Sequence, residues 1–341
     1  MSTPAAEARD VPAPLLLTQC DDVVSSDTYA ALSTTALAAG DPRVGALDQN
    51  WIGINPAFAL QHLQATQCFW QNDVPREDES GANDAFSSLA IVALPNADAA
   101  WKTYTDLYEL SAPEPPACNG EASVNARCWW TGLIAGSVWV DIVFTGMKNA
   151  GSDAANAANF APLVTEVVTN LEAAERGDVW EKPTGVLTIS RDCPSVLKAD
   201  TIASTTGADP KEVTFFRGRS AGTNLFLEAA IAAGSDACTW GTAQVENGLP
   251  VQVLEGGAWA WEAARESYPS ARDAREVTLT DLRDEESVWL RTGSRVPTID
   301  LIVDGSWISL LLYPEAATTL GVDAEETLTK LAQGIVDDLR P

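Results

Sequence analysis

Histidine is almost absent from this sequence, which has one in 341 residues, and no two of its six cysteines form a Cys-x-x-Cys pair. Zinc and iron–sulfur sites depend on such ligands, so we expect no metal or cofactor. Basic residues are also scarce: 21 against 48 acidic residues give a net charge of -27. Because this charge repels phosphates, nucleic acid is excluded as a partner.

Long apolar runs are absent too. No segment reaches the roughly 18 apolar residues of a membrane span, and no signal-peptide-like segment precedes residue 15. An even number of cysteines without metal-ligand spacing is typical of disulfides, which persist in oxidising compartments. We therefore expect an exported protein, extracellular or on the outer face of the cytoplasmic membrane, with its leader removed and membrane contact only through a possible N-terminal lipid anchor.

The chain contains an internal repeat. The eleven residues from Cys20 align without gaps on the eleven from Cys193 with five identities, whereas chance gives about one. Each copy later has a Cys-x-Trp motif, at Cys68 and Cys238. The repeat predicts this organisation: a disordered tether at 1–14, a first domain at 15–175, a linker at 176–186 and a second domain at 187–341.

Apolar periodicity predicts the same order of elements in both copies, with Asp27 and Asp200 as N-caps of an early helix. This order predicts an α+β fold of two similar domains related by duplication, each an antiparallel sheet packed with helices. The expected elements are helices at 58–64 and 225–233, strands at 89–94 and 251–254, helices carrying Trp101 and Trp261, strand–glycine–strand hairpins at 133–139 and 301–307, and final helices at 163–171 and 328–339.

Six cysteines allow 15 pairings, and the duplication selects one of them. The first two cysteines of each copy are 48 and 45 residues apart, so equivalent bridges are expected. The predicted disulfides are Cys20–Cys68, Cys193–Cys238 and, within the first copy only, Cys118–Cys128.

These motifs resemble a family. An early cysteine, a short helix with an aspartate at its start, a later Cys-x-Trp and an amphipathic C-terminal helix resemble the functionally uncharacterised actinobacterial cell-envelope lipoproteins. The resemblance implies a PsbP-like fold, here in tandem duplication, and brings no catalytic residues with it.

Catalytic motifs are weak. Gly218-Arg219-Ser220-Ala221-Gly222 matches a nucleophile elbow, but the histidine of that triad must follow the serine and His62 precedes it. We therefore interpret the motif as a glycine-containing turn and His62 as a structural side chain. The acidic insertion at 71–86 could bind calcium, although a solvated hairpin loop is the simpler interpretation.

Tryptophan is abundant, with twelve residues. The pairs Trp70/Trp240, Trp101/Trp261 and Trp139/Trp307 recur in both copies, which predicts core packing. Unmatched tryptophans are better candidates for ligand binding, because indoles form flat platforms for ring-bearing ligands. These candidates are Trp51, Trp129, Trp130, Trp180 and Trp259.

Function follows only as a set of hypotheses. The leading one is a non-catalytic extracellular or cell-surface binding protein of the bacterial envelope, acting on a small molecule, glycan or envelope protein through an inter-domain groove near Trp180 and Trp259 or a tryptophan-bearing sheet face. One alternative is a carbohydrate-active hydrolase that uses two carboxylates. The other is a structural or assembly protein of the envelope with a protein partner.

Overall fold

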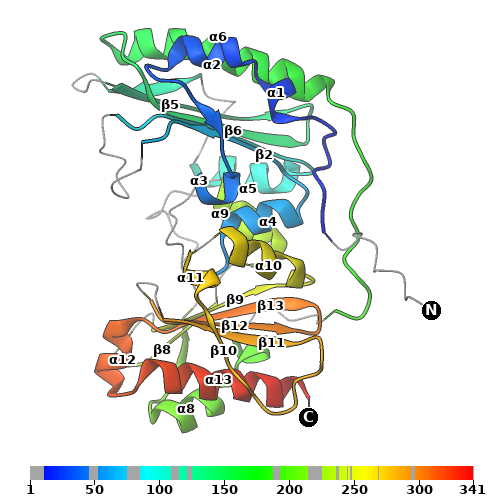
Figure 1. Cartoon of the computed structure of the whole chain (residues 1–341), viewed down its shortest axis with the longest axis vertical. Coiled ribbons are helices and arrows are strands. Elements are labelled where there is room, and N and C mark those ends of the chain that lie inside the picture. Colours follow the sequence, from blue (N-terminus) through cyan, green and yellow to red (C-terminus); the bar gives the residue numbers. More distant parts are fainter. Residues whose placement is uncertain are drawn as a thin grey trace.

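The fold has five layers, in which two antiparallel sheets alternate with three layers of helices (Figure 1). It is seen in a computed structural model. The predicted α+β class, with two similar helix-packed sheets, is confirmed. The residues described are 11–45, 53–74, 85–108, 115–120, 125–186, 193–213, 225–235, 238–243, 245, 248–267, 269–292 and 296–340.

The first sheet belongs to the first repeat and has the strand order β1-β2-β3-β6-β5-β4. Its strands are β1 (Ala38–Ala39), β2 (Thr66–Gln71), β3 (Ser88–Leu94), β4 (Ala117–Asn119), β5 (Asn125–Ile134) and β6 (Val138–Lys148).

The second sheet has the order β10-β11-β12-β13-β9-β8-β7. Read in reverse it repeats the first sheet, with β10 added at the edge. Its strands are β7 (Lys211–Val213), β8 (Cys238–Gly241), β9 (Leu249–Leu254), β10 (Arg275–Glu276), β11 (Ser287–Arg291), β12 (Thr298–Val303) and β13 (Ser306–Leu311).

The two outer helical layers bury equivalent sheet faces. In the first repeat the outer face packs on α1 (Cys20–Val23), α2 (Ser26–Leu32) and α6 (Asp153–Ala173). In the second it packs on α7 (Cys193–Val196), α8 (Ala199–Thr206), α12 (Pro314–Leu320) and α13 (Ala324–Leu339). None of the helices in these described ranges is long and apolar enough to span a membrane.

The central layer fills the space between the two inner sheet faces (Figure 1). It contains α3 (Pro42–Gly45), α4 (Pro56–His62), α5 (Asp98–Tyr108), α9 (Leu225–Ala233), α10 (Ala258–Ser267) and α11 (Pro269–Arg272).

Two of these helices are shared between the repeats. Phe58 of α4, from the first repeat, packs edge-on against Trp307 of the second sheet, with ring centroids 5.7 Å apart. Leu225 and Ala229 of α9, from the second repeat, lie in one buried cluster with Trp139 of the first sheet. Each repeat therefore covers part of the other's inner face, and the two form a single packed body.

Three disulfides join the pairs that the duplication predicts: Cys20–Cys68, Cys118–Cys128 and Cys193–Cys238. Each lies within one repeat. Disulfides of this kind indicate an oxidising compartment outside the cytoplasm.

Two local predictions need correction. Asp27 and Asp200 are not N-caps; the caps are Ser25 and Lys198, and both aspartates lie in the first helical turn, where a carboxylate favours the helix dipole. Residues 11–14, predicted as part of a disordered tether, lie against the chain after α4, where Gln64 Nε2 donates a hydrogen bond to the Ala13 carbonyl at 3.0 Å.

Candidate functional site

The predicted ligand-binding tryptophans lie in two places. Trp129 and Trp130 are on opposite faces of β5, where Trp129 is 37% exposed and Trp130 packs against the first core. Trp180 and Trp259 lie at the boundary between the repeats. Trp51 lies outside the described residues, as do Ser220 and residues 75–84 of the acidic insertion.

Among the repeat-matched tryptophans, Trp101 is half-buried and the other five are buried, so the structure supports a core role for these five.

The boundary pair is arranged around α4. Trp180 meets His62 edge-on at 4.9 Å between ring centroids, and Trp259 meets Phe58 at 6.2 Å. Neither indole Nε1 has a hydrogen-bond partner among the described residues. Both tryptophans therefore pack on the helix that joins the repeats, and the groove predicted beside them stays a prediction.

His62 lies at the same boundary, beside Trp180, and its pKa is low. Burial, together with the nearby Lys182 ammonium, lowers its pKa from 6.5 to about 4, although Glu255 acts in the opposite direction. Lys182 and Glu255 form an ion pair of 2.7 Å between the linker and the turn before α10. The imidazole is therefore neutral at pH 7, consistent with the structural role expected of it.

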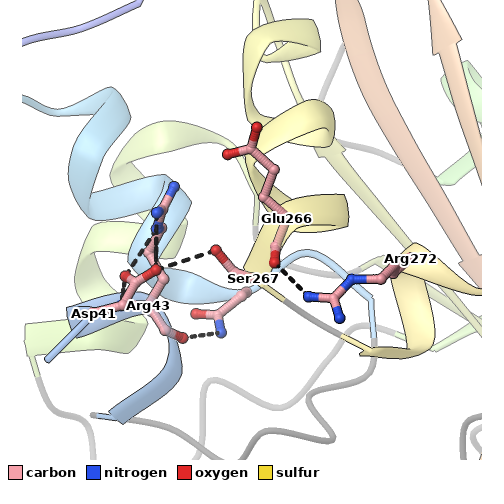
Figure 2. Close-up of polar contacts among 6 residues, drawn as sticks. Asp41, Arg43, Glu266, Ser267 and Arg272 are labelled. Atoms are coloured by element: carbon pink, nitrogen blue, oxygen red, sulfur yellow. Dashed lines mark hydrogen bonds and ion pairs between the residues drawn. The ribbon is translucent and has the colours of Figure 1, made fainter.

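A polar contact closes another part of the same boundary (Figure 2). The guanidinium of Arg43 donates charge-assisted hydrogen bonds to the Asp41 carboxylate, with Nε at 2.9 Å from Oδ1 and Nη2 at 2.8 Å from Oδ2. Ser267, at the end of α10, also donates to this carboxylate at 3.2 Å, from the other repeat. Burial acts to raise the pKa of Asp41, but these contacts with Arg43 and Ser267 lower it below its usual value. The cluster is satisfied internally, which indicates a structural joint.

The open part of the inner face lies around Trp129. One row of residues crosses four neighbouring strands of the first sheet: Ala90 pairs with Val143, Val143 with Trp129, and Trp129 with Ala117. We call these four residues the Trp129 row. Trp129 is exposed and the other three are half-exposed. The large indole is therefore flanked by the smaller side chains of alanine and valine.

Polar side chains flank this row on the same face. Arg127 and Thr131 lie two residues either side of Trp129 on β5, and Asp141 pairs with Thr131 across the strands. Burial raises the pKa of Asp141 from 3.8 to about 6, while the Thr131 hydroxyl and the Arg127 charge act to lower it. The face thus combines an aromatic surface with a cation, a hydroxyl and a carboxyl that titrates near neutral pH.

The equivalent row of the second repeat is closed. Counting from the matched Trp139 and Trp307, the position of Val143 is taken by Leu311, that of Trp129 by Thr298 and that of Ala117 by Arg291. All three are buried, at 2%, 0% and 3% exposure. The two copies of this face therefore have different surroundings.

Residues just before α4 provide the cover in the second repeat. Ile54 N donates to Gln252 Oε1 at 2.8 Å, and Arg291 donates to the Gly53 carbonyl at 3.3 Å. Any Cβ at Gly53 would come within 3.2 Å of Leu311 and closer still to Gln252, so a glycine is needed for this approach. Arg291 also pairs with the buried Asp300 at 2.7 Å, which accepts a hydrogen bond from Trp307 Nε1 at 2.8 Å.

Sequence reasoning identified Trp129 but missed Arg127, Thr131 and Asp141. A signal was present, because residues two apart on a strand share a face and the predicted hairpin around Gly136 sets Thr131 opposite Asp141. Metal binding has no support in the described ranges, where no group of three or more histidine, cysteine, aspartate and glutamate side chains could hold an ion.

Comparison with known proteins adds little. No protein-family model matches this chain, and no curated protein matches it in sequence. Among solved structures, the di-domain ARO/CYC StfQ from the steffimycin biosynthetic pathway is 10% identical, with 97% of this chain and 94% of that one covered and a TM-score of 0.14. The di-domain ARO/CYC BexL from the BE-7585A pathway is 10% identical, with 96% and 95% covered and a TM-score of 0.15. Scores this low carry no argument about function.

Proposed function

We propose that this chain is a non-catalytic binding protein of the bacterial envelope, and that it binds a ring-bearing, hydroxyl-rich ligand such as a glycan on the inner face of its first sheet. One observation carries the proposal: the Trp129 row is open in the first repeat, whereas its counterpart is buried in the second. The scaffold is the same in both copies, so the fold itself does not require an exposed indole at this position.

The residue types around the row suit a sugar. An indole face packs against the apolar C–H face of a pyranose ring. A carboxylate and a guanidinium beside it accept and donate pairs of hydrogen bonds to neighbouring hydroxyls. Trp129, Arg127 and Asp141 supply these three groups on one face.

Binding is favoured over hydrolysis by the number of carboxylates. Glycoside hydrolysis normally needs two acidic residues, one on each side of the scissile bond. The Trp129 row and its flanks carry one, Asp141. The raised pKa of Asp141 would suit a general acid, but no second carboxyl lies among the residues that define this face.

Isothermal titration calorimetry tests the proposal, after a glycan array has selected an oligosaccharide ligand. Trp129→Ala should weaken binding at least about tenfold, which corresponds to about 1.4 kcal/mol. Because Trp129 is already 37% exposed, this truncation should leave the fold intact.

Trp130→Phe is the matched control. Trp130 is the next residue on β5 and faces the first core. Its replacement by phenylalanine should therefore leave the dissociation constant unchanged. Full affinity in Trp129→Ala, or an equal loss in both variants, would contradict a binding site on the inner face.

A further inference from the structure

A small apolar cavity lies in the second repeat, away from the Trp129 row. It is bounded by β8, β9 and helices α8, α12 and α13, and its volume is ≈ 20 Å³. Its lining includes buried Ile202, Trp240, Leu249 and Leu331, together with half-exposed Thr242 and Leu320. Such a space holds about one or two groups of the size of a water molecule.

Divergence between the repeats accounts for this cavity. Ile202 stands nine residues after Cys193, and Tyr29 stands nine residues after Cys20, so the two positions are equivalent. In the first repeat the Tyr29 ring packs against Trp70 with centroids 5.4 Å apart. Trp240 is the counterpart of Trp70. Replacing a phenol ring by the smaller isoleucine side chain leaves space that Ile202 and Trp240 both line.

The lining selects an uncharged occupant. The Thr206 hydroxyl donates to the Ile202 carbonyl at 2.8 Å, and Thr242 Oγ1 accepts from Val245 N at 3.1 Å, so two of the three lining threonines are engaged in local bonds. Most other lining side chains are apolar. Apolar cavities of this kind stay dry and accept apolar guests.

We propose that this cavity binds the short, uncharged alkyl end of a small ligand, at a site independent of the Trp129 row. Packing around Trp240 is incomplete in a second respect, because its Nε1 is buried without a hydrogen-bond partner in the described residues. The first repeat fills the corresponding space with its own tyrosine ring, whereas the second leaves it for a guest.

Methyl NMR under xenon pressure, followed by titration with 1-butanol, tests the proposal on the full chain. In the wild type, both probes should shift the methyl signals of Ile202, Leu249 and Leu331. Ile202→Tyr, which copies the first repeat, should abolish the shifts of Leu249 and Leu331. Ile202→Phe fills the same space and serves if the tyrosine variant does not fold.

Tyr29→Ile is the reciprocal variant and should open a second xenon-responsive site beside Trp70. Trp129→Ala should leave the xenon response of the second repeat unchanged. The absence of shifts at Leu249 and Leu331 in the wild type, or equal shifts after Ile202 is enlarged, would overturn the proposal. Failure of Tyr29→Ile to respond would overturn the role of the tyrosine ring.

Discussion

At the scale of single residues, the titratable groups Asp141 and His62 change the stability with opposite dependence on pH. The pKa of Asp141 is raised to about 6, so its folded state prefers the protonated form. The loss of folding stability caused by ionising Asp141 is absent below pH 3.8 and complete above pH 6. The pKa of His62 is lowered to about 4, so its contribution is lost as pH falls from 6.5 to 4.

Asp141→Asn should therefore stabilise the protein at pH 7 and not at pH 3.5. Because the Asp141 side chain is half-exposed, solvent screening reduces the gain in the free energy of unfolding to about 1–2 kcal/mol. Urea denaturation across pH 3.5–7.5 measures the difference between variant and wild type, in which other carboxylates cancel. A difference that does not change with pH would contradict the assignment to Asp141.

His62→Gln is the complementary variant. It should remove the stability loss between pH 6.5 and 4 and so leave the opposite slope of Asp141 visible in the same titration. Two variants with the same slope would show that neither group titrates as described.

At the scale of elements, the two hairpins that carry Trp139 and Trp307 provide different hydrogen-bond acceptors for the buried indole Nε1. Trp139 Nε1 donates to the Thr131 hydroxyl at 2.7 Å, whereas Trp307 Nε1 donates to the Asp300 carboxylate at 2.8 Å. The carboxylate of Asp300 is fully buried and needs Arg291 on β11, whereas the first repeat has Ala117 at that place and keeps its carboxyl at Asp141.

Arg291→Ala should lower the free energy of unfolding by about 3–5 kcal/mol, because it leaves the Asp300 charge buried without its partner. Arg127→Ala, at an exposed side chain on β5 of the first sheet, should change it by less than about 0.5 kcal/mol. Chemical denaturation of the two variants makes the comparison, and equal effects would contradict the difference between the hairpins.

Many of the helices and hairpins were predictable from the sequence. The helix at Leu225–Ala233 and the glycine hairpins were predicted because apolar periodicity and Gly136 or Gly305 act locally. The final helix of the first repeat begins at Asp153, ten residues before its predicted start, because Pro162 lies inside it and interrupts the apolar pattern. Both helix N-caps were misplaced by two residues, because the preceding backbone conformation decides them.

The inner faces were beyond sequence reasoning. Phe58 and Leu225 both appear as ordinary apolar residues of their own repeats, yet each packs in a cluster with the other repeat's sheet. Nothing local distinguishes such contacts. For the same reason Trp129 could be named a candidate, but the openness of its row became clear only beside its buried counterpart.

At the scale of the whole molecule, the shared layer predicts that the repeats stay together without a covalent link. No disulfide among the three joins them. A protease site inserted between Thr184 and Gly185, both exposed, allows the linker to be cut. The cleaved protein should elute as one species in size-exclusion chromatography, because separation would expose α4 and α9. Two separate peaks would contradict the shared layer.

We propose that one copy of the duplicated sheet face is open for a ligand, while the other is closed by the chain itself. Indole ¹H–¹⁵N NMR during titration with the selected oligosaccharide tests it most directly, because each tryptophan Nε1 gives its own signal. We expect the Trp129 signal to shift until the site is saturated, while the signals of Trp130 and Trp307 stay in place. A stationary Trp129 signal at saturating ligand, with any other indole moving instead, would contradict it.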